Sequence, residues 1–223
     1  MTEKIKPITQ DFEHSTQLQN FHKFISKFIS YKFTLANENT EHILDILYYL
    51  EEADWENYYS EIKSKFVSAF SSINSSSTLK QSFLRLLGKV CIFPSFMEVK
   101  EFPKLVYKVV LENHSEKNNN IMIKNSWVLA NLCANFTHFN IFSIEENQKI
   151  LLMSLGYCNS NKEKLISNGF RALGYYIKNN TDELMCQTIE SNDSQAESIK
   201  KALNEVSKKP FAQCSVKVLF YYS

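Results

Sequence analysis

The chain has 223 residues, of which 25 are Lys or Arg and 24 are Asp or Glu, and it contains only 4 Gly and 4 Pro. This near-neutral balance excludes a non-specific nucleic-acid binder, which needs an excess of basic residues to neutralise phosphates. So few Gly and Pro cannot supply the turns of an all-β domain or the tight loops of an α/β nucleotide-binding fold. We therefore expect a mostly helical chain.

The N-terminus carries no apolar secretory segment and is too acidic for a transit peptide, which favours a cytosolic or nuclear protein. The most apolar stretches, such as 149–158 and 216–222, fall short of the roughly 20 residues that span a bilayer. Five cysteines without a C-x-x-C pair favour buried, reduced thiols over disulfides or a zinc site. They are Cys91, Cys133, Cys158, Cys186 and Cys214.

Two amphipathic helices are predicted in the first third of the chain. Apolar residues recur at three- and four-residue spacing from Phe21 to Ile29, with lysines on the other side. A second stripe runs from Trp55 to Ile73 and ends at the turn-forming run 74–78. Each stripe would bury one face of its helix against a neighbouring helix.

The later helices are marked by their starting residues. Pro103 suits the first turn of a helix that contains Val106 and Val110. A serine followed three residues later by a glutamate is the pattern of a capping box, in which each side chain satisfies a backbone N–H of the other. This pattern occurs at Ser143 with Glu146, Ser160 with Glu163, and Ser194 with Glu197. Pro210 suits the start of a last helix, and 118–120 and 179–180 read as loops.

A short pattern with a central leucine recurs along the chain. The leucines are Leu47, Leu87, Leu129, Leu173 and Leu219. Their spacing rises from 40 to 46 residues in steps of two, which is the repeat length of HEAT and armadillo proteins. Each interval has room for one further helix, and the small residues Gly88, Ala130 and Gly174 would let a neighbouring helix approach closely.

The repeat predicts an all-α fold, a right-handed α-α superhelix of the HEAT/armadillo type with about five two-helix repeats. We expect one solenoid over 1–223, because a single helical hairpin cannot bury its apolar face alone. The last repeat would be truncated. The approximate repeats are 1–52, 55–94, 96–137, 141–180 and 182–223.

Two strings one repeat apart resemble a known family. Residues 125–132 and 168–175 are similar to successive HEAT repeats of the HEAT repeat-containing protein 6 family, which shows W-x-L-A-N-L and N-G-x-R-A-L-G-N-L strings at this spacing. The resemblance extends over about 80–223. It implies a large α-solenoid scaffold of poorly defined role, of which this chain would be a portion.

Trp127 and Asn131 also resemble the W-x-x-x-N signature of importin-α-type armadillo proteins. In that family the Asn amide bonds the backbone of an extended basic peptide and the Trp rings hold lysine stems. The matching positions in other repeats are basic, such as Arg85 and Arg171, and would repel such a ligand. Both a structural role and peptide capture remain open for this pair, and we favour the structural role.

An enzyme is not indicated, because the five histidines are scattered and no nucleotide-binding, hydrolase or kinase motif occurs. We predict no catalytic residue, metal, cofactor or small-molecule substrate, although a site assembled by the fold is a third alternative. The leading hypothesis is a scaffold that binds a protein or extended peptide on the concave row of inner helices. The candidate binding residues are Arg85, Lys89, Trp127, Asn131, Arg171, Tyr175 and Lys217.

Overall fold

The computed structural model describes residue 48 and residues 77–98, 101–190 and 194–208. Within these ranges the chain is built from helices and loops, and no strand occurs. The two N-terminal amphipathic helices, the last helix with Pro210, the thiol of Cys214 and the repeat leucines Leu47 and Leu219 lie outside the described residues.

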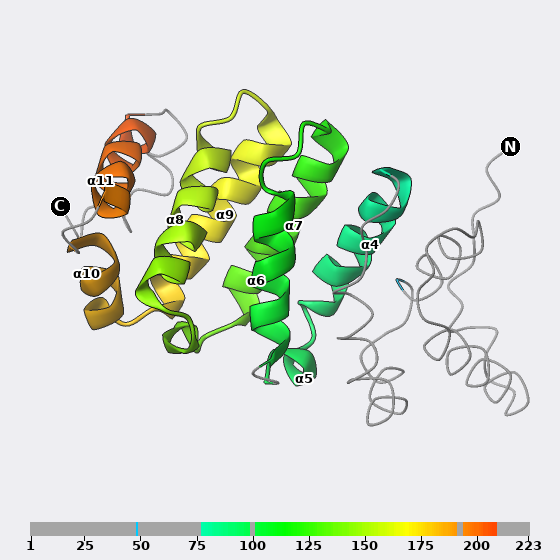
Figure 1. Ribbon diagram of the computed structural model, residues 1–223, viewed down its shortest axis with the longest axis horizontal. Coiled ribbons are helices and arrows are strands. Elements are labelled where there is room, and N and C mark those ends of the chain that lie inside the picture. The colour runs from blue at the N-terminus through cyan, green and yellow to red at the C-terminus, as the bar shows by residue number, and fades with distance from the viewer. Residues whose placement is uncertain (1–47, 49–76, 99–100, 191–193, 209–223) are drawn as a thin grey trace, which may run out of the picture. The chain divides into compact units, whose positions relative to one another are not determined.

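The described residues form eight α-helices and one 3₁₀-helix (Figure 1). In chain order these are α4 (Ser77–Val90), α5 (Pro94–Met97), α6 (Glu101–Asn113), α7 (Asn119–Asn135), η2 (Phe139–Ile141), α8 (Ile144–Cys158), α9 (Glu163–Asn179), α10 (Asp182–Glu190) and α11 (Ser194–Ser207). The chain divides into two compact units, Met1–Leu87 and Gly88–Ser223, so the division falls within α4. The predicted repeat boundaries stay a prediction.

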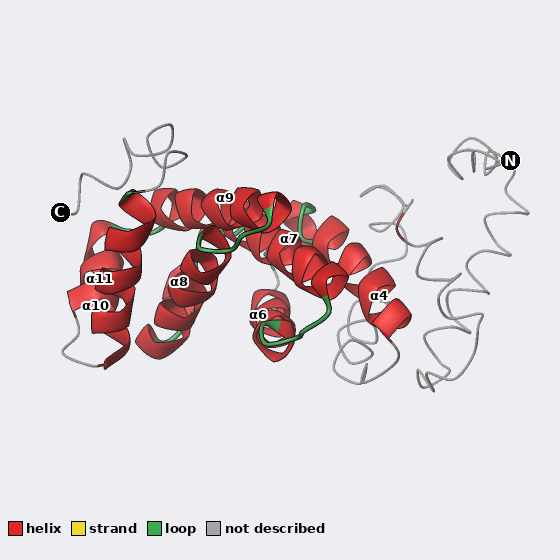
Figure 2. Cartoon of the chain, turned by 90° about the horizontal axis from the view of Figure 1, so that it is seen from above, coloured by secondary structure: helices red, strands yellow, loops and turns green. Residues whose placement is uncertain are grey.

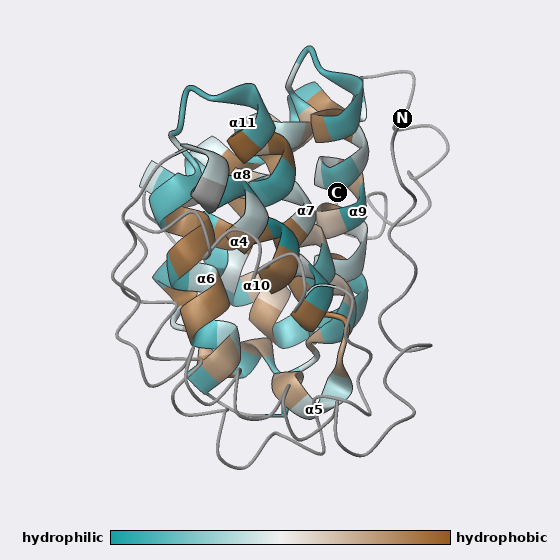
Figure 3. Cartoon of the chain, turned by 90° about the vertical axis from the view of Figure 1, so that its right-hand side faces the viewer, coloured by the Kyte–Doolittle hydropathy of each residue, from teal (hydrophilic) through white to brown (hydrophobic). Residues whose placement is uncertain are grey.

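The second unit is built from two layers of helices. Helices α7 and α9 lie side by side in one layer, while α6 and α8 pack against them in the other (Figure 2). Both α10 and α11 pack on α8. Hydrophilic and hydrophobic bands alternate along these helices (Figure 3), as expected when each helix buries one face. The packing therefore depends on helix-to-helix contacts between neighbouring repeats.

The repeat pattern is confirmed where the structure describes it. Leu87, Leu129 and Leu173 lie on α4, α7 and α9 and are each at most 2% exposed. The interval between two of these leucines holds a long helix, α6 or α8, as predicted. It also holds a short element, α5 or η2, so each interval has one element more than the two-helix unit expected from spacing alone.

The short η2 segment contributes an aromatic cluster to the core. The ring of Phe139 lies 5.2 Å from that of Phe136 and 4.9 Å from that of Tyr176 on α9, in both cases edge-on. The ring of Phe142 lies 5.5 Å from Tyr107 on α6. Edge-to-face aromatic pairs add to the free energy of burial, so this loop connects both helical layers.

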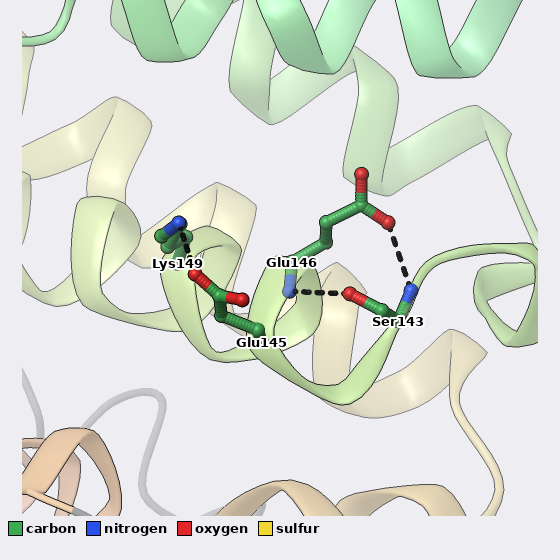
Figure 4. A network of polar contacts seen from close by, with 4 residues as sticks. All are labelled: Ser143, Glu145, Glu146 and Lys149. Atoms are coloured by element: carbon green, nitrogen blue, oxygen red, sulfur yellow. Dashed lines mark hydrogen bonds and ion pairs between the residues drawn. The ribbon is translucent and has the colours of Figure 1, made fainter.

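One predicted capping box is present at the start of α8 (Figure 4). The backbone N–H of Glu146 donates to Ser143 Oγ over 3.2 Å, and the N–H of Ser143 donates to Glu146 Oε2 over 2.8 Å. On the next turn Lys149 Nζ pairs with Glu145 over 2.6 Å. Pro103 lies in the first turn of α6, also as predicted.

Two predicted capping boxes and two predicted loops differ from the structure. Helix α9 begins one residue after Lys162, and Ser160 Oγ instead accepts from the N–H of Lys162, because the chain makes a turn there before the helix starts. Helix α11 begins at Ser194 itself, and Glu197 accepts from Lys200. Residues 77–78, predicted as part of a loop, belong to α4. Residues 119–120, also predicted as loop, belong to α7, because Asn118 caps that helix by accepting from the N–H of Asn120.

Side-chain amides satisfy the carbonyls at several helix C-termini. The last four carbonyls of a helix lack intrahelical partners, and a glycine at positive φ commonly provides a cap. No described residue has a positive φ. Amides from other helices donate to four of these ends. The bonds are Asn131 to Gly88 O of α4 (2.7 Å), Asn125 to Val110 O of α6 (2.9 Å), Asn179 to Cys133 O of α7 (2.8 Å) and Gln148 to Thr188 O of α10 (3.2 Å).

The backbone explains why two of these carbonyls need an external donor. The N–H of Ile92, four residues after Gly88, donates to Lys89 O over 3.0 Å. The N–H of His114, four residues after Val110, donates to Leu111 O over 3.3 Å. Both helices therefore tighten at their last turn, and the amide of another helix provides a donor to the bypassed carbonyl.

The cysteines follow the predicted pattern with one exception. Cys91, Cys133 and Cys158 are free thiols that are fully buried, and burial raises the pKa of the Cys91 and Cys133 thiols well above the ordinary value. Cys186 on α10 is exposed, which corrects the expectation of a buried thiol. It lies on the outer side of a short helix whose Met185 occupies the core.

Close approach of helices is confirmed at Gly88, is absent at Gly174, and occurs at Gly169, which was not predicted. A Cβ on Gly174 would have no atom within 4 Å, so no other helix lies close to this position. A Cβ on Gly169 would lie 2.5 Å from Cys158 N and 2.9 Å from the carbonyl carbon of Tyr157. Helix α9 therefore meets the end of α8 at Gly169. Gly88 is close to Trp127, as expected from its place in the repeat.

We expect Gly169→Ala and Gly174→Ala to have opposite effects on stability. Because rigid backbone surrounds Gly169, its substitution should cost about 1–3 kcal/mol of unfolding free energy by overpacking. Gly174→Ala occupies open space in the same helix and should gain up to about 1 kcal/mol from helix propensity. Urea denaturation followed by circular dichroism measures both changes. A stabilising Gly169→Ala variant would contradict the packing of α8 against α9.

Stability should also depend on the protonation of His114. Its ring lies 5.2 Å from that of Tyr157, and burial lowers the His114 pKa from its ordinary value of 6.5. Because the unfolded chain binds this proton more readily, the contribution of His114 is present above the unfolded pKa and declines as the pH falls below it. The urea midpoint of the wild type should therefore fall more between pH 7.5 and pH 5 than that of His114→Phe. Equal acid sensitivity would contradict the assignment.

Candidate partner-binding surface

The structure brings most of the predicted binding residues into the second unit. Lys89 lies at the C-terminal end of α4, Trp127 and Asn131 on α7, and Arg171 and Tyr175 on α9. Two others are not part of this arrangement: Arg85 belongs to the Met1–Leu87 unit, and Lys217 lies outside the described residues. In its own unit the Arg85 guanidinium lies 3.9 Å from the centre of the Tyr48 ring.

Asn131 is a buried link between helices. Its side chain is 0% exposed; Nδ2 donates to Gly88 O over 2.7 Å, and Oδ1 accepts from Arg171 Nη2 over 2.6 Å. Because one end of the amide meets an acceptor and the other a donor, its orientation is fixed. This geometry favours the structural role of Asn131 over hydrogen bonding to a bound peptide backbone.

Trp127 is half-buried and covers the α4 glycine. A Cβ on Gly88 would lie 2.3 Å from Trp127 Cε3 and Cζ3, so only glycine leaves room for the indole ring at this position. Trp127 thus has a packing role against α4.

Lys89, Tyr175 and Arg171 of the predicted set differ in exposure. Lys89 is half-buried, and its Nζ lies 5.6 Å from the centre of the Phe93 ring, a distance suited to a cation–π contact. Tyr175 is 38% exposed, one turn after Arg171. Arg171 is also exposed, although its guanidinium is held by Asn131.

Two further cations on α9 were missed by sequence reasoning. Lys164 and Lys178 are exposed and lie seven residues before and after Arg171. Seven residues are close to two helical turns, so the three cations share one face of α9, together with Tyr175. The seven-residue spacing within α9 is readable in the sequence, whereas the leucine repeat compares positions in different helices.

Charge is segregated between the helices of the second unit. Helices α7 and α9 contain four basic residues and one acidic residue, Glu163, in the first turn of α9. Helices α8 and α10 contain five acidic residues and one basic residue, Lys149. The near-neutral total therefore hides a basic face on α9, which we call the α9 basic face and define by Lys164, Arg171 and Lys178.

Other features of the described residues do not lead to a catalytic site. No group of three His, Cys, Asp or Glu among them is placed to hold a metal ion. A hollow of about 590 Å³ lies beside the end of α7, between α5 and η2, and Glu98, Asn135 and His138 are among its lining residues. None of the seven predicted binding residues lines it. None of the described helices combines the length and apolar character needed to cross a membrane.

Comparison with known proteins places the fold. A designed armadillo repeat protein in complex with the peptide (KR)4 matches with a TM-score of 0.67 and 10% identity, over 94% of this chain and 86% of that chain. An engineered protein studied by the Northeast Structural Genomics Consortium matches with a TM-score of 0.55 and 13% identity, over 88% of this chain and 83% of that chain. The chain has an armadillo-type helical-repeat fold, which confirms the predicted fold class.

No family model and no curated protein matches the sequence. The resemblance to the HEAT repeat-containing protein 6 family is therefore supported only as far as the helical-repeat architecture. At 10% and 13% identity the two solved structures show a shared fold and nothing about a shared ligand.

The link through Asn131 makes a testable prediction about stability. Asn131→Ala removes the donor to Gly88 O and the acceptor for Arg171, and the unsatisfied buried groups should cost about 1–3 kcal/mol. Arg171→Gln should cost less than about 1 kcal/mol, because Arg171 is an exposed residue and this substitution leaves the bond from Asn131 to Gly88 O in place. Chemical denaturation of both variants measures the difference. Equal losses would mean that the bond to Gly88 contributes nothing.

Proposed function

We propose that this protein is a non-enzymatic scaffold or adaptor that binds a segment of another protein on the exposed faces of α7 and α9. These helices carry the repeat leucines, and the repeat pattern assigns them to the concave row of inner helices. The observation that carries the proposal is the exposed Arg171, held by Asn131, with Tyr175 one turn away and the half-buried Trp127 on the neighbouring helix.

The residue types on this surface support binding of a protein. Trp, Tyr and Arg contribute most to the affinity of protein interfaces, because they bury large areas and make directed hydrogen bonds. Trp127, Tyr175 and Arg171 supply one of each from two adjacent helices. Repeat proteins commonly use such a row for an extended partner, since each repeat presents equivalent positions at regular intervals.

The second candidate is an adaptor for extended basic peptides. The W-x-x-x-N pattern of Trp127 and Asn131 favours it, and the designed armadillo protein of similar fold is in complex with the peptide (KR)4. Two observations on this chain oppose it. The amide of Asn131 is buried and already bonded at both ends, and the α9 basic face would repel Lys and Arg side chains.

Charge-reversal variants test the location of the binding surface. Proteins captured from cell extract by the immobilised wild type would be compared with those captured by Arg171→Glu plus Lys178→Glu. The matched control, Lys104→Glu plus Lys108→Glu, reverses two exposed lysines on α6 in the other layer. We expect specific partners to be reduced at least about tenfold by the α9 pair alone, since like charges at an interface are strongly unfavourable.

The proposed surface is wrong if every partner of the wild type is retained by the α9 pair. It is also wrong if the α6 pair causes the same loss. Circular dichroism of each variant establishes that the helices are intact, because all four lysine or arginine positions are exposed and their side chains are not needed in the core.

A further inference from the structure

The three cations of the α9 basic face lie in line. Lys164, Arg171 and Lys178 are separated by seven residues, which corresponds to about 10.5 Å along a helix that rises about 1.5 Å per residue. All three side chains are exposed. A ligand that follows α9 would therefore meet a positive charge at regular intervals.

These cations lack acidic partners within the described part of the chain. The ion pairs seen there join Lys149 to Glu145 and Lys200 to Glu197, each within one helix. On α9 the positions three or four residues from Arg171 are Ser167, Asn168, Gly174 and Tyr175, which bear no negative charge. The only acidic residue of α9, Glu163, lies in its first turn, where the helix dipole favours it. The face thus keeps its positive charge available.

Arg171 is more ordered than an ordinary surface arginine. Its Nη2 donates a hydrogen bond to Asn131 Oδ1 over 2.6 Å, and Asn131 Nδ2 in turn donates to Gly88 O. A guanidinium has five N–H donors, so most remain available for a ligand. Because part of its conformational freedom is already lost, Arg171 needs less ordering when it binds a planar carboxylate. Asn131 is therefore a positioning residue for Arg171.

We infer that the partner segment is acidic, with carboxylates that face Lys164, Arg171 and Lys178 in turn. This inference rests on the proposed function and specifies the chemistry of its ligand. A polyproline II segment rises about 3.1 Å per residue with three residues per turn, so an acidic residue at every third position presents carboxylates on one face about 9.3 Å apart. That spacing matches the cations of α9 to about 1 Å per step.

Fluorescence anisotropy with the full chain tests this inference. Three labelled peptides, (Glu-Pro-Ser)4, (Gln-Pro-Ser)4 and (Lys-Pro-Ser)4, differ only in charge. We expect the glutamate peptide alone to bind, with an affinity that falls as salt rises because exposed charges are screened. A single-stranded oligonucleotide of similar length serves as a second polyanion.

Variants separate the oriented guanidinium from simple charge. Arg171→Gln and Arg171→Lys should each weaken binding of the glutamate peptide by about tenfold, because both lose a bidentate, charge-assisted contact. Lys178→Gln should weaken it by only about threefold, as expected for an exposed lysine. Lys108→Gln, on α6, removes one exposed charge elsewhere and should change affinity by less than about twofold.

Several results would overturn the inference. Equal binding of all three peptides would mean that the surface does not select charge, while the proposed protein-binding surface would stand. Preference for the lysine peptide would favour the basic-peptide adaptor. Tighter binding of the oligonucleotide would point to nucleic acid, and binding of no peptide at all would reject an acidic ligand. Full retention of affinity by Arg171→Lys would reject the positioning role of Asn131.

Discussion

Hydrogen bonds from side-chain amides to helix C-terminal carbonyls are the interaction on which this architecture depends. A helical-repeat chain has many helix ends, and each leaves carbonyls that need donors. With 4 Gly in 223 residues and no described residue at positive φ, the glycine cap is rarely available. Asn125, Asn131, Asn179 and Gln148 supply donors from other helices instead. Capping thus becomes a tertiary contact between helices, and the bonded residues lie from 15 to 46 positions apart in the sequence.

The same device shapes the candidate binding surface. Asn131 caps α4, which commits its Nδ2 to Gly88 and leaves Oδ1 for one donor. Arg171 provides that donor and is held at the surface of α9 as a result. An asparagine that a sequence pattern associates with peptide capture therefore acts on the protein's own backbone, and Arg171 is the group that we propose for ligand binding.

The sequence was sufficient for the class of fold but not for the contacts between helices. The spacing of Leu87, Leu129 and Leu173 predicted their burial, and Ser143 with Glu146 marked a helix start, because both signals are local or periodic. Gly169 and Gly174 look alike in sequence, yet only Gly169 meets another helix. Which carbonyl Asn131 reaches depends on the angle between helices, and no one-dimensional pattern contains that angle.

The interhelical caps also limit how such a chain can change in length. The capped pairs join Gly88 to Asn131 and Cys133 to Asn179, across 43 and 46 residues. One residue inserted within a helix would rotate all later side chains by about 100°, and the amide would miss its carbonyl. Residues can be added in the connecting loops without this rotation. Leu129 and Leu173 each lie ten residues after the first residue of their helix, Asn119 in α7 and Glu163 in α9, so the angular register of the repeat leucine is kept although the intervals differ in length.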